Sequence, residues 1–191
     1  MAYLTSGRSL LERVACNPVN YWATLVTDVV GAAVFAWLGV RWYSGPWVTA
    51  SILIVAGMIG WGLLEYLLHR WVLHGRVPAI KREHGRHHGQ PQATISTPLF
   101  VIPICAVLLC AALSLVISNG AAAILTFGFY VGYNYFAIVH HLLHHRPSTL
   151  ARSRYFEVHL RLHEIHHREP NVHFGISNSM WDRVFGTFRA R

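Results

Sequence analysis

The residues of this chain best suited to chemistry are its histidines, which occur in groups. All of the 14 histidines except His173 lie in four short groups, within residues 65–75, 84–88, 140–145 and 159–167. Imidazole nitrogen is a good ligand for iron, zinc, copper and nickel ions. The grouping therefore predicts a metal site, although any single pair taken alone would be explained as solvated histidines on a basic face.

Two of the groups contain histidines with the spacing i, i+3, i+4. His84 is followed by His87 and His88, and the sequence HEIHH at 163–167 repeats the spacing. In an α-helix, residues three and four apart lie on one face, so each trio can serve one metal ion or lie between two. The four groups together hold more imidazoles than one ion can coordinate, which predicts two ions.

The group at 140–145 leaves the choice of ligands open. It contains two i, i+4 pairs, His140 with His144 and His141 with His145, and either pair could face a metal. The second pair also belongs to an HxxHH trio of its own, which strengthens that alternative. Spacing alone does not decide between the two pairs.

The group at 65–75 has an irregular spacing. His69 and His74 are five residues apart, which places them about 140° from each other around a regular α-helix. They converge only if the helix ends or bends between them, and Gly75 would suit such an end. Glu65, one turn before His69, is a candidate to accept a hydrogen bond from a ligand imidazole; alternatively it pairs with Arg70 at the lipid headgroups.

Four long apolar runs must position these groups: roughly residues 21–40, 47–68, 98–117 and 121–139. Each is close to the ~20 residues that a helix needs to cross the ~30 Å hydrocarbon core of a bilayer. As a helix, each run would be apolar on all sides and not on one face alone, which favours membrane spans over the core of a soluble bundle. The sequence thus predicts an all-α integral membrane protein with four transmembrane helices, and its length predicts one domain, residues 1–191.

Basic residues lie almost entirely on one side of the predicted spans. All of the 16 Lys and Arg residues except Arg41 fall before the first span, in the loop 69–97 or after the last span. Because Lys and Arg are enriched in cytoplasmic loops, both termini and the histidine regions 69–97 and 140–191 are expected in the cytosol, where they form a helical cap. The net charge of +8 then faces anionic headgroups, and nucleic-acid binding is not expected.

The succession HRWVLH (69–74), HGRHH (84–88), HHLLHH (140–145) and HEIHH (163–167) resembles the fatty acid hydroxylase/sterol desaturase superfamily. The tail FGISNSMWDRVFGT (174–187) resembles its fatty acid 2-hydroxylase branch. The resemblance implies an O2-dependent di-iron hydroxylase, an oxidoreductase that inserts a hydroxyl group into a C–H bond of a membrane lipid acyl chain or fatty acid. It also implies a multi-pass protein of the bacterial inner membrane, or of the endoplasmic reticulum in a eukaryote.

The resemblance implies ten metal ligands. By position they are His69, His74, His84, His87, His88, His140, His144, His163, His166 and His167. Further ligands, or groups that orient a ligand, would come from His141, His145, His159 and Glu65, with His145 the first choice. His173 is expected at the surface, and Asp182 with Arg183 is expected to tie the C-terminal segment to the helices.

The resemblance also implies cofactors and partners. Two Fe ions are expected, with Zn able to replace them in purified protein because imidazole sites take zinc readily. Electrons would come from an external donor, either a cytochrome b-type protein or a ferredoxin with its reductase. Besides O2, the other partner is the membrane lipid or fatty acid substrate.

Two alternative functions stay open at this point. One is a carotenoid or sterol hydroxylase or desaturase of the same superfamily, which the 174–187 tail fits less well. The other belongs to a different class, a non-catalytic membrane protein that binds or transports metal. Transport would place polar ligands along the spans, yet Asp28 and Glu65 are the only charged residues within them.

Overall fold

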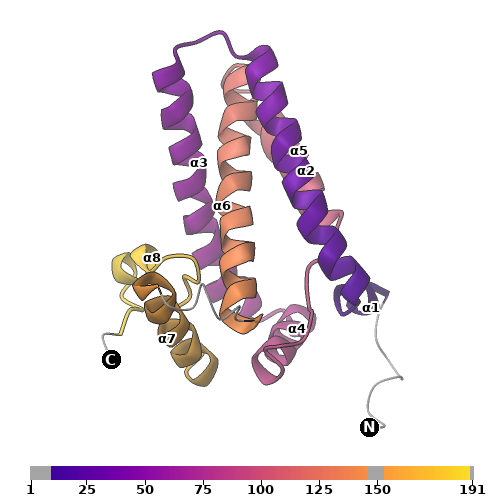
Figure 1. Cartoon of the computed structure of the whole chain (residues 1–191), viewed down its shortest axis with the longest axis vertical. Coiled ribbons are helices and arrows are strands. Elements are labelled where there is room, and N and C mark those ends of the chain that lie inside the picture. Colours follow the sequence, from indigo (N-terminus) through magenta and orange to yellow (C-terminus); the bar gives the residue numbers. More distant parts are fainter. Residues whose placement is uncertain (1–9, 146–152, 190–191) are drawn as a thin grey trace.

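The computed structural model describes residues 10–145 and 153–189, and within these ranges its regular structure is entirely helical. Residues 1–9, 146–152 and 190–191 lie outside the described residues, so the two ends of the predicted domain and part of the predicted 140–191 region are not described. Three long helices, α2 (Pro18–Trp42), α3 (Trp47–Leu67) and α6 (Asn119–His145), form an elongated bundle (Figure 1).

Three of the four predicted spans are helices of spanning length. Pro18–Trp42, Trp47–Leu73 and Asn119–His145 are each long and apolar enough to cross a membrane. The predicted span 98–117 is instead α5 (Val101–Leu113), whose 13 residues reach about 20 Å, less than the ~30 Å of hydrocarbon. Four full spans are therefore not confirmed, because turns at both ends shorten the apolar run as a helix.

The helix α6 lies in the middle of the bundle and approaches α3 closely through glycines. A Cβ at Gly57 would lie 2.4 Å from the backbone oxygen of Leu125, and one at Gly128 would lie 2.3 Å from that of Ile54. Real Cβ atoms do not approach so closely, so the two backbones can pack at this distance only with glycine at the contact. Small residues are the usual means of close packing between membrane helices.

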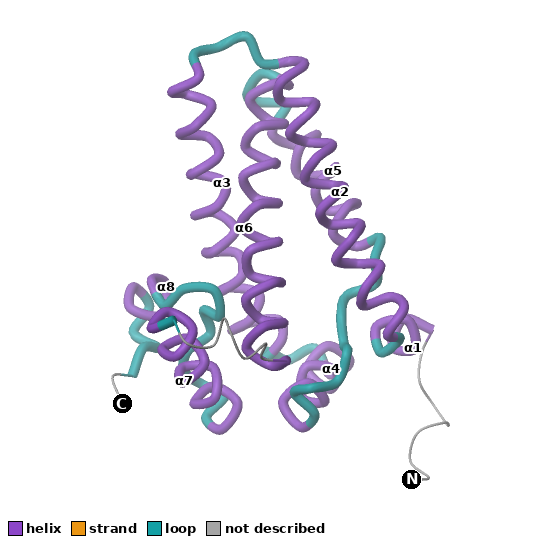
Figure 2. The backbone as a smooth tube through the Cα atoms, in the orientation of Figure 1, coloured by secondary structure: helices purple, strands orange, loops and turns teal. Residues whose placement is uncertain are grey.

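The remaining helices gather at one end of the bundle (Figure 1). They are α1 (Leu10–Ala15), α4 (Pro78–Gly89), α7 (Arg154–Arg168) and α8 (Met180–Val184). The loop between α4 and α5 runs beside the lower part of α2 (Figure 2), where the Asn20 amide donates to Ser96 Oγ (2.9 Å) and to the Thr97 carbonyl (3.0 Å). All four histidine groups lie on the helices or turns of this end.

The helix α3 changes its winding where it reaches this end. Residues Leu68–Leu73 (η1) form a π-helical turn, and the His74 N–H donates to the His69 carbonyl over 3.1 Å. A hydrogen bond between residues five apart closes a wider turn than in an α-helix. His69 and His74 therefore face the same side, which is how the predicted bend between them is realised.

Candidate metal centre

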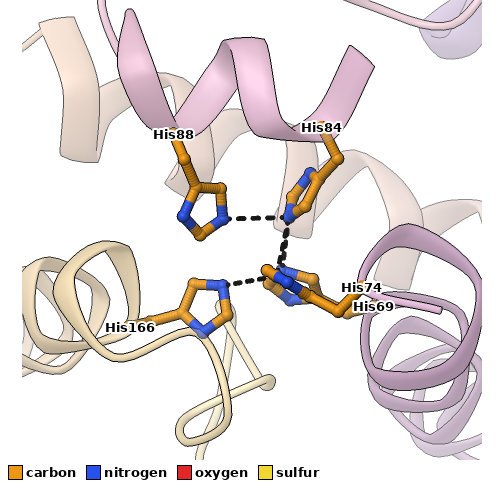
Figure 3. Close-up of side chains that lie close together, drawn as sticks. All are labelled: His69, His74, His84, His88 and His166. Atoms are coloured by element: carbon orange, nitrogen blue, oxygen red, sulfur yellow. Dashed lines mark hydrogen bonds between the residues drawn. The ribbon is translucent and has the colours of Figure 1, made fainter. Parts of the chain in front are cut away.

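Five histidines bring their Nε2 atoms together in one group. His69 comes from η1, His74 follows it, His84 and His88 lie on α4, and His166 lies on α7 (Figure 3). The Nε2 atom of His84 is 3.1 Å from that of His69, 2.9 Å from that of His74 and 3.0 Å from that of His88. His74 Nε2 is also 3.0 Å from His166 Nε2. We call these five residues the first group.

A second group forms beside the first. The Nε2 atom of His140, on α6, is 3.1 Å from those of His87 and of His144. His163 Nε2, from α7, lies 2.8 Å from His144 Nε2. These four residues form a potential metal site, and His167 Nε2 adjoins it at 3.1 Å from His163 Nε2. We call these five residues the second group.

The helices α4 and α7 each contribute to both groups. On α4, His84 and His88 turn toward the first group and His87 toward the second. On α7, His166 belongs to the first group and His163 to the second. Each i, i+3, i+4 trio therefore lies between two groups and does not serve one alone, and all ten histidines implied as ligands are found in the two groups.

The hydrogen bonds of the first group fit a metal ion. The carbonyls of Phe174 and Val172 lie 2.6 Å from His69 Nδ1 and 2.7 Å from His166 Nδ1. Because a carbonyl only accepts, both Nδ1 atoms carry the hydrogen and both Nε2 atoms present lone pairs. His84 Nε2 has three nitrogen neighbours and at most one hydrogen to share. A cation resolves this crowding of lone pairs, and ligands ~2.1 Å from a metal lie about 3 Å apart when adjacent.

The histidines of both groups are neutral at physiological pH. Burial, with added repulsion from neighbouring imidazoles, lowers the pKa of His84 and of His87 to about 2. The same burial lowers the pKa of His166 to about 3. Since a metal ligand must be deprotonated, these environments keep the lone pairs available for an ion.

The pair His141 and His145 lies away from both groups. Its rings stack on each other with centroids 4.6 Å apart, and His141 Nδ1 is 2.6 Å from the hydroxyl of Tyr21 on α2. Of the two pairs that spacing left open, the structure brings His140 and His144 into the second group. It places His145, the first choice for an additional ligand, outside.

Two further histidines are also outside the groups. His159 stacks on Tyr155, with ring centroids 4.1 Å apart, and its Nδ1 is hydrogen-bonded to the Tyr155 carbonyl. His173 is 2% exposed, so its expected surface position is wrong. Its backbone has a φ of 54°, in the left-handed region, and its ring packs edge-on against Phe188. It is buried against the C-terminal residues, since its N–H donates to the Thr187 carbonyl and its ring contacts Phe188.

Glu65 contacts the backbone and not a histidine. It is buried, and its carboxylate accepts from the N–H groups of Ile176 and Ser177 and from the Ser177 hydroxyl. Arg70, its alternative predicted partner, donates to the Tyr66 hydroxyl instead. The carboxylate thus holds a stretch of backbone whose carbonyls in turn contact two histidines.

That stretch is the functional part that sequence reasoning missed. The residues Val172 and Phe174 act through carbonyl oxygens, which every residue has, so no side-chain pattern marks them. Asp182, predicted with Arg183 to tie the C-terminal segment to the helices, bonds within that segment: its carboxylate accepts from the N–H groups of Phe174 and Gly175, both over 2.8 Å. Arg183 lies over the ring of Phe188, and the tie to a bundle helix comes from Glu65. The tail motif FGISNS was the available signal.

Known proteins resemble this chain over most of its length. Residues 54–187 match the family model described as fatty acid hydroxylase. Dihydroceramide fatty acyl 2-hydroxylase FAH2 of Arabidopsis thaliana is 31% identical over 191 residues, covering 88% of this chain and 77% of the relative. Fatty acid 2-hydroxylase of Rattus norvegicus is 30% identical over 151 residues, covering 71% of this chain but 39% of the relative.

A solved structure shares the fold. The structure of full-length Scs7p, in which only the hydroxylase domain is visible, superposes with a TM-score of 0.77. The match covers 95% of this chain and 70% of that one, at 21% sequence identity. The two proteins therefore share the fold, and this likeness concerns the fold alone.

Proposed function

Because this chain belongs to the fatty acid hydroxylase family and is an oxidoreductase, we propose that it hydroxylates a C–H bond of a lipid acyl chain with O2 and two iron ions. The observation that carries the proposal is the pair of histidine groups, whose Nε2 atoms lie as metal ligands do. The curated relatives named for dihydroceramide acyl chains and for fatty acids support an acyl substrate, attached to a sphingoid base or free.

The first and second groups would each hold one ion. Bound iron supplies the redox chemistry that activates O2. The residues of the chain do the rest: the carbonyls of Phe174 and Val172 fix the tautomer of two ligands, and burial keeps the other imidazoles neutral. Electrons would come from a separate cytochrome b-type or ferredoxin donor. We place the site and both termini in the cytosol because almost all Lys and Arg residues lie on their side of the predicted spans, and such residues are enriched on the cytoplasmic side.

An apolar cavity offers a place for the acyl chain. It has a volume of about 490 Å³ and lies between α3, α5 and α6. Its lining includes Trp61, Leu67, Ala106, Leu109 and Tyr133. Such a lining excludes water and gives an acyl chain the surroundings it has in the bilayer.

The cavity is linked to the second group by one aromatic residue. Phe136 packs against Trp61 and Tyr133, two residues of the cavity wall, with ring centroids 5.9 and 6.3 Å away. On its other side the Phe136 ring stacks on His140, with centroids 5.7 Å apart. A wall residue, Trp61 or Tyr133, and then the ring of Phe136 therefore lie between the cavity and His140.

The test is a reconstituted reaction with isotopically labelled oxygen. Purified protein loaded with iron, a reducing system, ¹⁸O2 and either free fatty acid or ceramide should give a product heavier by one labelled oxygen. His163→Ala should abolish the product, and His145→Ala, outside both groups, should not. A product lacking two hydrogens would make the protein a desaturase, and metal uptake into vesicles without O2 consumption would make it a carrier.

A further inference from the structure

The first group is oriented by one buried stretch of irregular backbone, Val172–Ser177, which we call the orienting segment. Two of its carbonyls, those of Phe174 and Val172, accept from His69 and His166 as described above. Both of those histidines belong to the first group. The position of the segment therefore sets the direction in which two Nε2 lone pairs of one group point.

Two buried carboxylates hold the orienting segment. Asp182 accepts from the N–H groups of Phe174 and Gly175, both over 2.8 Å. Glu65 accepts from the N–H groups of Ile176 (2.6 Å) and Ser177 (3.0 Å) and from the Ser177 hydroxyl (2.6 Å). Both carboxylates are almost fully buried, so water does not compete for these bonds.

The rest of the segment is equally constrained. The N–H groups of Val172 and His173 donate to the carbonyls of Glu169 and Thr187, so every N–H of the segment is used. The Tyr155 hydroxyl donates to the Ser177 carbonyl over 2.7 Å. Irregular backbone stays buried only when its polar groups are satisfied in this way, and here that makes the segment a rigid support.

Among residues 10–145 and 153–189, no segment supports the second group in a comparable way. His163 Nδ1 is buried without a hydrogen-bond partner. Among the residues that the structure describes, none bonds to Nδ1 of His87, His140 or His144, and their contacts at Nε2 are with one another. Within the described part of the chain, the rings of these four histidines are thus oriented by packing, without a hydrogen bond at Nδ1.

We propose that Glu65 and Asp182 are positioning residues that make the two metal sites unequal, so that the first group retains its ion longer than the second. Groups that hydrogen-bond the far nitrogen of a ligand fix the ring and its tautomer, and losing them typically lowers metal affinity about 10–100-fold. The inference rests on the proposed metal centre and not on the reaction that the centre performs.

The experiment follows release of zinc from the full chain in detergent. Protein loaded with two zinc ions is mixed with excess chromogenic chelator, and the released metal is recorded with time. We expect two phases of equal amplitude whose rates differ about tenfold or more. His163→Ala, which damages the second group, should remove the fast phase and leave the slow one. A single phase in the unmodified protein would overturn the proposal, and so would loss of the slow phase in His163→Ala.

Variants of the support test the positioning role directly. Glu65→Ala should accelerate the slow phase about 10–100-fold and leave the fast phase unchanged. Ser177→Ala, which removes one hydrogen bond to Glu65, should accelerate the same phase less and serves if the first variant does not fold. Equal acceleration of both phases in either variant contradicts a selective role.

The matched control is Asn20→Ala. Asn20 is also buried and makes three hydrogen bonds, to Ser96, Thr97 and Leu99, but it contacts no part of the orienting segment. It should leave the slow phase unchanged, whereas acceleration here would show that general destabilisation explains the effect. Protein that binds no zinc refutes the metal centre itself, and protein with two unequal zinc sites but no hydroxylation refutes only the enzyme activity.

Discussion

At the scale of single residues, the direction of each imidazole was less predictable than its presence. Spacing did not distinguish the pair His140 and His144 from the pair His141 and His145, because the two members of each pair lie on one helix face. The decision depends on which face α6 turns toward its neighbours. His141 contacts the Tyr21 hydroxyl of α2, and His140 contacts His87 of α4. Neither neighbour can be inferred from the sequence near residue 140.

His84 is the residue on which the first group depends most. Its Nε2 is within 3.1 Å of three other Nε2 atoms. We expect His84→Ala to reduce bound metal from two ions per chain to one, as measured by elemental analysis of purified protein. His141→Ala is the control, since its ring bonds to Tyr21 and contacts neither group. Two retained ions in His84→Ala would contradict this assignment.

The lowered histidine pKa values predict how metal-free protein responds to acid. An unfolded histidine takes up a proton near its usual pKa of about 6.5, while folded His84 and His87 stay neutral to a pKa of about 2. Above pH 6.5 neither state is protonated, so stability is unaffected. Below it the unfolded state binds more protons, so stability falls as the pH decreases.

Thermal unfolding of the metal-free protein at pH 7.5 and pH 5 measures this effect. The midpoint should be lower at pH 5, and the double variant H84Q/H87Q should show a smaller decrease because two of the responsible groups are gone. A midpoint that does not change with pH would show that the histidines are hydrated in the folded protein and not buried.

At the scale of helices, apolar runs predicted positions well and lengths less well. The runs near 21–40 and 47–68 correspond to α2 and α3, but the run 98–117 is a helix only over Val101–Leu113. Composition is apolar throughout this run, so it does not show where turns end the helix. The π-helical turn at Leu68–Leu73 is a second example, since a bend was expected there but its geometry depends on packing around His69 and His74.

The crossing of α3 and α6 depends on glycine. A side chain at Gly128 would meet the Ile54 carbonyl oxygen at 2.3 Å, so Gly128→Ala must push the helices apart. Overpacking of this kind typically costs about 1–3 kcal/mol, and we expect a lower unfolding midpoint in detergent. Gly85→Ala on α4 is the control, because a Cβ there meets nothing within 4 Å. That substitution should be neutral or slightly stabilising, since glycine within a helix costs about 0.5–1 kcal/mol relative to alanine.

At the scale of the whole molecule, the site exists because distant segments meet at one end of the bundle. The first group joins residues of η1, α4 and α7, and the second joins α4, α6 and α7. The histidine motifs made this convergence predictable. The support through Glu65 did not follow from the sequence, because its partners Ile176 and Ser177 are more than one hundred positions away and bond through their backbone.

The cavity between α3, α5 and α6 is the proposed place of the acyl chain, and filling the cavity with a larger side chain tests that proposal. Leu109 lines the cavity, whereas its neighbour Leu108 is 63% exposed on the outer side of α5. Leu109→Trp should reduce turnover of long acyl chains on the order of tenfold, because the bulkier ring occupies space that the chain would use. Shorter chains should be affected less, and the bound metal should be unchanged.

Leu108→Trp adds the same ring at a position that faces away from the cavity. Product mass spectrometry over a series of acyl-chain lengths compares the two variants with the unmodified protein. If Leu108→Trp and Leu109→Trp alter the chain-length profile equally, the cavity does not hold the substrate. If Leu109→Trp alone shifts the products toward shorter chains while both proteins keep two metal ions, the acyl chain lies between α3, α5 and α6 during the reaction.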